Sequence, residues 1–265
     1  MNIVKKYNQR AEKINSLLCV GLDPDFSKLS EKFKALEFPQ FEFTKYIIDS
    51  THEFAAAYKP NIAFYEARGD QGLKELKLTM EYLQKNFSDI FTICDAKRAD
   101  IGNTNNGYIA SIFDWLGFDA ITLHPYFGSE ALGPFLDRSD KVCIILCRSS
   151  NPGAAEVQDL KTDGRPVWQV IAEKTSKEWN KNGNCMLMVG ATYPEEMKVV
   201  RSLAGDMTLL VPGIGAQGGD IKATVEAGLN SKKLGMIINS SRGIIFAENP
   251  GEEAKKLRDE INKYR

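Results

Sequence analysis

The chain has 265 residues, 43% of them hydrophobic, a length that suits two small domains or one large α/β domain such as a barrel. The formal net charge is −1, so the overall charge does not point to nucleic acid or to an anionic membrane surface as a partner. The N-terminus lacks the apolar core of a signal peptide, and no apolar run approaches the length of a transmembrane helix. We therefore expect a soluble cytoplasmic protein.

Cysteine and histidine usage narrows the chemistry further. The five cysteines lie in or beside short apolar runs, and they form no Cys-x-x-Cys pair. This pattern argues against a disulfide framework or a zinc knuckle and favours buried, reduced thiols. Only two histidines occur, His52 and His124, which excludes a histidine-rich metal site within one chain, and we assign neither of them a chemical role.

Eight short, β-rich apolar runs follow one another along the chain. Their middles are continuously apolar rather than alternating, as expected for parallel strands that are covered on both faces. The runs are residues 17–23, 57–62, 91–97, 119–125, 141–148, 185–191, 208–215 and 236–242.

Helical patterns separate these runs. Apolar residues that recur every three or four positions mark one helix face before the second run and another before the third. Pro194 and Pro250 each precede carboxylates within a few residues, which predicts a helix start at each proline. The apolar faces consist of Phe43, Ile47 and Phe54, and of Leu73, Leu76, Met80 and Leu83.

Eight strand–helix units of roughly thirty residues each predict a single (β/α)8 barrel that spans residues 1–265. Residues 1–16 are expected to form an extra helix that closes the bottom of the barrel. A doubly wound open sheet is the competing layout. It is less favoured, because no Gly-x-Gly-x-x-Gly turn follows the first run.

Charged residues stand at the ends of the second and third runs, where a barrel carries its chemistry. Asp95 and Lys97 are two apart in a strand and should share one face, and Lys59 ends the neighbouring strand. Asp100 follows shortly after. A plain buried ion-pair network would also explain this pattern, but four charges at two adjacent strand ends favour a functional site.

A glycine-rich turn follows the seventh run, in residues 212–219 (PGIGAQGG). Such a turn lets backbone N–H groups approach an anion closely, and Arg242 after the eighth run offers a bidentate cation. A tight turn beside a surface arginine is the alternative. Because the glycine-rich turn and Arg242 lie in adjacent strand–helix units, we predict a phosphate site there. The long loop 149–166 is either a lid, a base-recognition loop or an inert excursion.

Residues 95–104 (DAKRADIGNT) match the pattern D-x-K-x-x-D-I-x-x-T. Together with six further matching segments, this pattern makes the chain resemble the orotidine 5′-phosphate decarboxylase family over nearly its whole length. The resemblance is closer to the longer bacterial branch of that family. Two positions depart from that branch: Ala99 replaces its usual glycine, and His124 its usual asparagine. The other matches are residues 21–24 (GLDP), 59–61 (KPN), 149–154 (SSNPGA), 189–192 (VGAT), 212–220 (PGIGAQGGD) and 239–242 (NSSR).

The resemblance implies decarboxylation of orotidine 5′-phosphate to uridine 5′-phosphate and CO2, the last step of de novo pyrimidine biosynthesis, without a metal or organic cofactor. It implies that Lys97 is the general acid that protonates C6 of the pyrimidine. Asp95 would lie against the substrate carboxylate. Lys59 and Asp100 would complete the charge array.

The same resemblance implies a set of substrate contacts and a homodimer. Asp23 corresponds to a contact with a ribose hydroxyl, and Ser150 to a contact with the pyrimidine. In the family, the residues matching Asp100 and Thr104 reach into the active site of the partner subunit. The implied contacts around the substrate phosphate are Pro212, Gly215, Gln217 and Arg242.

Two alternatives belong to other functional classes. The first is a metal-dependent sugar-phosphate decarboxylase or aldolase of the same barrel superfamily, such as ketogulonate-phosphate decarboxylase or hexulose-phosphate synthase. These enzymes place an acidic metal ligand where this chain has Lys59, whose charge would repel Mg²⁺. The second is a non-catalytic barrel that binds nucleotides, which has no need of four clustered charges.

Overall fold

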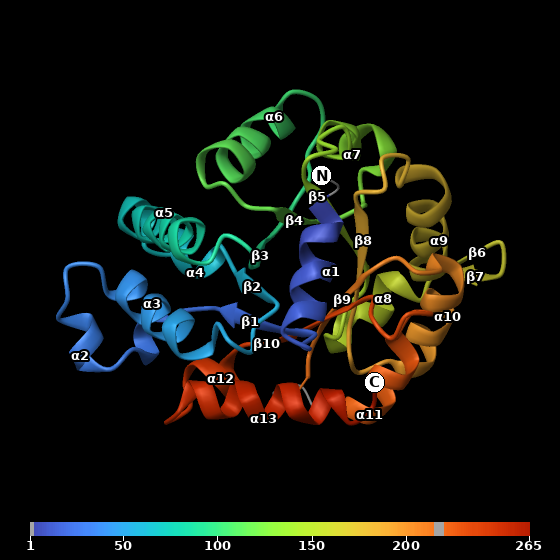
Figure 1. Ribbon diagram of the computed structural model, residues 1–265. Helices are drawn as coiled ribbons and strands as arrows, with labels where there is room; N and C mark the ends of the chain where they lie inside the picture. Colours follow the sequence, from blue (N-terminus) through green and yellow to red (C-terminus); the bar gives the residue numbers. More distant parts are fainter. Residues whose placement is uncertain (1–2, 215–219) are drawn as a thin grey trace.

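The computed structural model describes residues 3–214 and 220–265. Eight parallel strands close into a barrel in the order β1-β10-β9-β8-β5-β4-β3-β2, with helices arranged around it (Figure 1). The predicted (β/α)8 barrel is confirmed, and the open doubly wound sheet is wrong. The barrel strands are β1 Leu18–Leu22, β2 Ala57–Pro60, β3 Phe91–Arg98, β4 Ala120–Leu123, β5 Val142–Arg148, β8 Cys185–Val189, β9 Leu209–Pro212 and β10 Met236–Ser240.

Each of the eight apolar runs supplies one of these strands. All residues of β1, β2, β4, β8 and β10 are buried, because one strand face packs inside the barrel and the other packs against helices. Gly21 of β1 is level with Lys59 of β2, and Asn239 of β10 is level with Cys19 of β1. This register brings the carboxyl ends of the strands to one mouth of the barrel.

The helices that cover the barrel follow the predicted periodicity. In α5, Leu76, Met80 and Leu83 are buried, whereas Phe54 lies beyond the end of α3 and so does not extend its apolar face. Pro194 and Pro250 begin α10 and α13 as predicted. The helices are α1 Ile3–Lys13, α2 Glu31–Lys34, α3 Pro39–Thr51, α4 Ala63–Glu66, α5 Gly69–Asn86, α6 Thr104–Ile109, α7 Gly128–Leu136, α8 Ala155–Gln158, α9 Val167–Lys174, α10 Pro194–Ala204, α11 Ile221–Gly228, α12 Arg242–Ile245 and α13 Pro250–Asn262. Short 3₁₀ turns span Phe26–Lys28 and Pro152–Ala154, and π-helical turns span Ala110–Trp115 and Thr175–Trp179.

Helix α1 lies across the amino-terminal ends of the strands (Figure 1), as predicted. The hydroxyl of Tyr7 donates to the carbonyl of Met236, the first residue of β10. Lys6 Nζ lies 2.7 Å from Asp119 Oδ2, just before β4. These contacts close the barrel bottom and leave the opposite mouth for chemistry. Within residues 3–214 and 220–265, no helix is both long enough and apolar enough to span a bilayer.

The long segment between β5 and α9 contains a small hairpin that the sequence analysis did not predict. Its two strands are β6 Lys161–Thr162 and β7 Arg165–Pro166, paired antiparallel. Asp163 and Gly164 connect them with φ values of +50° and +77°, the left-handed backbone that a two-residue hairpin turn requires. The segment therefore contains regular structure, namely the 3₁₀ turn Pro152–Ala154, helix α8 and this hairpin.

Candidate active site

A cavity of about 290 Å³ opens at the carboxyl ends of the strands. It is lined by residues that lie far apart in the sequence and meet because parallel strands end at one rim. Seven of the predicted site residues line it: Asp23, Lys59, Asp95, Lys97, Ser150, Pro212 and Arg242. Predicted residues Gly215 and Gln217 lie outside the part of the chain that the structure describes.

Lys59, Asp95 and Lys97 form one continuous ion-pair array. Lys59 Nζ lies 2.8 Å from Asp95 Oδ2, and Lys97 Nζ lies 2.5 Å from Asp95 Oδ1. The side chains of Lys59 and Asp95 are only 5% and 11% exposed, whereas that of Lys97 is 47% exposed. Both lysines line the cavity, and Lys97 is the more exposed of the two.

The two buried members of the array hold each other in the charged form. Burial by itself would raise the pKa of Asp95, but the ammonium groups of Lys59 and then Lys97 outweigh it and hold that pKa well below its usual range. Burial by itself would lower the pKa of Lys59, but Asp95 and then Asp23 raise it above its usual value. The cavity therefore keeps fixed opposite charges on one wall.

The backbone around Lys97 departs from a regular strand. Lys97 has a φ of +47° and Ala99 a φ of +155°, conformations that favour glycine. The register between β3 and β4 shifts between Cys94 and Arg98. The predicted proximity of Asp95 and Lys97 is confirmed, but strand alternation alone does not account for it, because Lys97 sits in this irregularity. Ala99 stands where the longer bacterial branch named above usually has glycine, and its positive φ is one that favours glycine.

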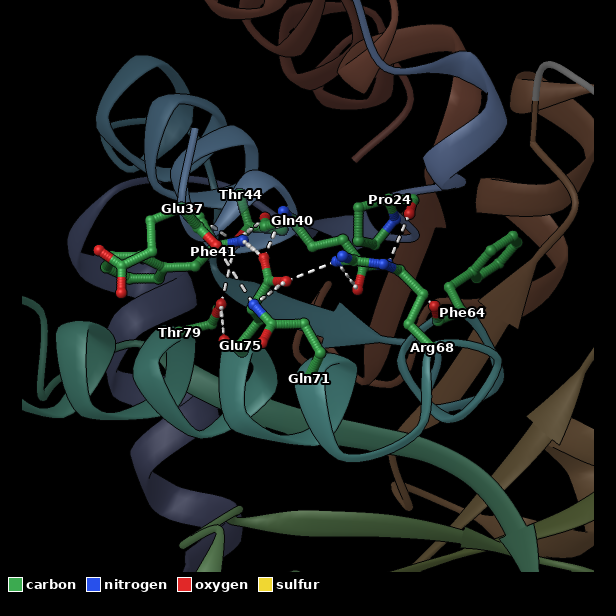
Figure 2. Close-up of polar contacts among 10 residues, drawn as sticks. All are labelled: Pro24, Glu37, Gln40, Phe41, Thr44, Phe64, Arg68, Gln71, Glu75 and Thr79. Atoms are coloured by element: carbon green, nitrogen blue, oxygen red, sulfur yellow. Dashed lines mark hydrogen bonds and ion pairs between the residues drawn. The ribbon is translucent and has the colours of Figure 1, made fainter. Parts of the chain in front are cut away.

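Asp23 lies at the end of β1, and its Oδ1 accepts a hydrogen bond of 3.3 Å from the backbone N–H of Asn61. The residue after it, Pro24, is fixed by a buried polar cluster between α3 and α5 (Figure 2). Gln40 Nε2 donates to the carbonyls of both Pro24 and Phe64, at 2.9 and 2.8 Å. Gln40 thereby links the segment after β1 to helix α4, which follows β2.

Glu75 is the centre of that polar cluster (Figure 2). Its side chain is fully buried. Its Oε2 accepts the backbone N–H groups of Gln40 and Phe41 at 2.5 and 2.9 Å, and its Oε1 lies 2.5 Å from Arg68 Nη1. The carboxylate satisfies N–H groups at the start of α3 that have no partner within the helix, so the cluster also fixes that helix end.

The loop after β5 places Ser149, Ser150 and Asn151 on the cavity wall. Gln158 anchors this part of the loop, because its Oε1 accepts the Ser149 backbone N–H at 2.9 Å and its Nε2 donates to Ser149 Oγ at 2.7 Å. Arg148, which is 2% exposed, pairs with Asp159 at 3.3 Å. The start of loop 149–166 therefore belongs to the site.

Asp100 and Thr104 are not among the described residues that line this cavity. Asn105 holds Asp100 in place by accepting its backbone N–H at 2.8 Å and by donating to its carbonyl at 2.5 Å. Thr104 is exposed at the start of α6, and Ile101 between them is 62% exposed. Neither predicted residue therefore contributes to the described cavity of its own chain.

Six polar residues on the cavity wall were not predicted as site residues: Asn61, Ser149, Asn151, Asn239, Ser240 and Ser241. Of the three asparagines among them, Asn61 and Asn239 lie next to or within a barrel strand. Asn239 is only 7% exposed, and its buried Oδ1 has no hydrogen-bond partner within residues 3–214 and 220–265. Both asparagines stand at strand ends inside the matched segments KPN and NSSR. Their position at the carboxyl end of a strand was the signal that could have found them.

Comparisons with known proteins agree with the geometry. A family model described as the orotidine 5′-phosphate decarboxylase / HUMPS family matches residues 16–257. The chain is 44% identical over 260 residues to the orotidine 5′-phosphate decarboxylase of Cellvibrio japonicus, covering 97% of this chain and 94% of that protein. The corresponding protein of Flavobacterium johnsoniae is 46% identical over 248 residues, covering 94% of this chain and 90% of that protein. The solved structure of Leishmania donovani OMP decarboxylase has a TM-score of 0.90 at 40% identity and covers 100% of this chain and 99% of that chain. This chain belongs to the orotidine 5′-phosphate decarboxylase / HUMPS family.

Proposed function

We propose that the chain decarboxylates orotidine 5′-phosphate to uridine 5′-phosphate and CO2, as a single barrel over residues 1–265 and without a metal or organic cofactor. The observation that carries the proposal is the array in which Lys59 and Lys97 flank Asp95 at 2.8 and 2.5 Å. The metal-dependent sugar-phosphate enzymes carry an acidic metal ligand at this position, whereas this chain carries the cationic Lys59. The array therefore favours the decarboxylase within the family.

Decarboxylation requires a positively charged group close to C6 of the pyrimidine. When the bond between C6 and the carboxylate carbon breaks, its electron pair stays on C6, in an orbital that the ring does not delocalise. The ammonium of Lys97, whose side chain is 47% exposed, stabilises this developing charge electrostatically and then transfers a proton to C6, leaving a neutral amine that solvent reprotonates. Lys97 thus serves as both the fixed charge and the general acid.

Asp95 and Lys59 keep Lys97 in position. Asp95 accepts from Lys97 on one oxygen and from Lys59 on the other, so the carboxylate cannot rotate without losing an ion pair. The Asp95 carboxylate also lies where it would face the departing carboxylate of the substrate. Lys59, which is almost fully buried, compensates the negative charge of Asp95.

The remaining cavity walls match the other parts of the nucleotide. Arg242 and Pro212 line the cavity and would bind the phosphate, together with Gly215 and Gln217. Asp23 would accept from a ribose hydroxyl, and Ser150 would contact the pyrimidine. Binding energy gained at the phosphate, remote from C6, can then be used to organise the charge array.

The protein would act as a homodimer in which Asp100 and Thr104 complete the site of the partner subunit. Their absence from the cavity of their own chain and the 62% exposure of the neighbouring Ile101 support this arrangement. Tyr126 and Phe127, after β4, are 82% and 49% exposed and offer apolar surface to a partner. The five buried, unpaired cysteines fit a reducing compartment such as the cytoplasm.

The direct test is the loss of orotate-ring absorbance when the purified protein is mixed with orotidine 5′-phosphate in EDTA. We expect turnover to uridine 5′-phosphate that EDTA does not affect. Loss of turnover on chelation would instead support a metal-dependent sugar-phosphate enzyme. Tight binding of uridine 5′-phosphate without any change in substrate absorbance would support a non-catalytic nucleotide-binding barrel.

A further inference from the structure

Thr122, in the middle of β4, contacts three consecutive residues of the charged segment in β3. Its side chain is fully buried. Thr122 Oγ1 accepts the backbone N–H groups of Ala96 and Lys97 at 3.0 and 2.9 Å, and it donates to Asp95 Oδ1 at 3.1 Å. Thr122 is not among the described residues that line the cavity, so it would act on the substrate only through its neighbours.

These three contacts use the full hydrogen-bonding capacity of a hydroxyl. A hydroxyl has two lone pairs and one proton, and here both lone pairs accept backbone N–H groups. The proton therefore has one remaining direction, toward Asp95 Oδ1. That oxygen is also the one that Lys97 Nζ contacts at 2.5 Å. The orientation of the carboxylate and the backbone of Lys97 are thus set by the same atom.

The irregularity in β3 explains why a side chain is needed at this point. Cys94 pairs with Ile121 and Arg98 pairs with Leu123, so the intervening residues of β3 outnumber those of β4. Among these additional residues of β3, Ala96 and Lys97 donate their backbone N–H groups to the Thr122 side chain. The hydroxyl thus supplies hydrogen-bond acceptors for backbone N–H groups of an irregular segment, in which Lys97 has a φ of +47°.

We infer that Thr122 is a positioning residue for the decarboxylation, which fixes the Asp95 carboxylate and the backbone of Lys97 so that the Lys97 ammonium faces C6. The inference rests on the proposed function of Lys97. A misplacement of catalytic groups of about 1 Å can cost about 100-fold in rate, so loss of this hydroxyl should lower turnover rather than substrate affinity.

The test compares Thr122→Val with Thr122→Ser. Valine keeps the branched shape but removes the hydroxyl, and serine keeps the hydroxyl. We expect T122V to lower kcat by about 100-fold while KM and the affinity for uridine 5′-phosphate stay within about threefold of wild type. T122S should retain kcat within about threefold.

Thr92→Val is the matched control. Thr92 is a buried threonine on β3 at the opposite end of the barrel, where its hydroxyl donates to Asp119 Oδ2 at 3.0 Å and accepts the Asp119 backbone N–H at 3.1 Å. T92V likewise removes a buried hydroxyl that donates to a carboxylate and accepts a backbone N–H. It should lower the unfolding midpoint while leaving kcat within about threefold of wild type. An equal fall of kcat in T92V and T122V would mean that the effect is general to barrel stability.

Other outcomes also decide the matter. T122V with a kcat within about threefold of wild type, or a T122S variant as impaired as T122V, overturns the positioning role. If T122V does not fold, Thr122→Cys decides in its place, because a thiol bonds weakly, and an unchanged kcat there overturns the role. Failure of the wild-type protein to convert orotidine 5′-phosphate would refute the proposed function itself.

Discussion

The ammonium nitrogen of Lys59 lies 2.8 Å from Oδ2 of Asp95, and both side chains are nearly removed from solvent. Removing one partner of such a pair leaves the other charge buried without full compensation, which costs about 3–5 kcal/mol. We expect Lys59→Met to lower the free energy of unfolding by about this amount and to reduce turnover. Lys59→Met combined with Asp95→Asn should recover most of the stability but no turnover. Urea unfolding and kcat, measured on the same preparations, check both parts, and a fully stable single variant would contradict them.

The same pair defines a pH window for stability. The pKa of Asp95 is lowered in the folded state, so its contribution is present above about pH 4 and is lost as the pH falls through the folded value. The pKa of Lys59 is raised, so its contribution is present below about pH 10 and is lost as the pH rises through the folded value. The stability difference between wild type and K59M/D95N should therefore be constant between about pH 5 and 9. Unfolding titrations in urea measure it, and a steady decline within that range would refute the assignment.

Asp100 offers a test of the shared active site. If Asp100 serves the partner subunit, a mixed dimer of one Lys97→Ala chain and one Asp100→Asn chain contains one site with both groups intact. The two inactive variants, unfolded and refolded together, should then regain about a quarter of wild-type activity, because half of the dimers are mixed and each has one intact site. Each variant refolded alone is the control. No recovery in a mixture whose mass confirms mixed dimers would place Asp100 in the site of its own chain.

The Glu75 cluster in Figure 2 should support both stability and substrate binding. Glu75→Gln removes the charge that accepts Arg68 and two backbone N–H groups, so we expect a loss of about 3 kcal/mol in the free energy of unfolding. The KM for substrate should rise, because the cluster holds the loop after Asp23. Glu81→Gln on the same helix, whose exposed pair with Lys77 spans 3.5 Å, is the control and should cost less than about 0.5 kcal/mol. Equal effects of the two substitutions on unfolding would contradict the importance of the buried cluster.

Much of the fold could be predicted from local pattern. Continuous apolar runs identified all eight barrel strands, since strands buried on both faces carry no polar alternation. The proximity of Lys59 and Asp95 followed from their place at the ends of neighbouring strands, because β2 and β3 pair directly. The hairpin at Asp163 and Gly164 was missed, although an Asp-Gly pair is a turn signal, because its strands are only two residues long.

The parts of the site that were missed depend on geometry that no single segment contains. The backbone at Lys97 adopts a positive φ although lysine does not favour it, so local propensity gave no sign of the irregularity in β3. Thr122 looked like an ordinary strand residue, because threonine is common in strands and its three polar contacts lie on the neighbouring strand. The burial of Asn239 against the cavity likewise required the register between β1, β9 and β10.

The role of Lys97 is the central claim, and one variant tests it most directly. Lys97→Ala removes the ammonium that lies 2.5 Å from Asp95 but leaves Arg242 and the other walls of the cavity unchanged. We predict that it binds uridine 5′-phosphate within about threefold of wild type and loses at least ~10³-fold in kcat, the scale expected when a general acid and a fixed charge are removed together. Single-turnover loss of orotate absorbance, with enzyme in excess of substrate and well above KM, measures this without interference from product release. A Lys97→Ala protein that retains near-wild-type turnover would contradict the account.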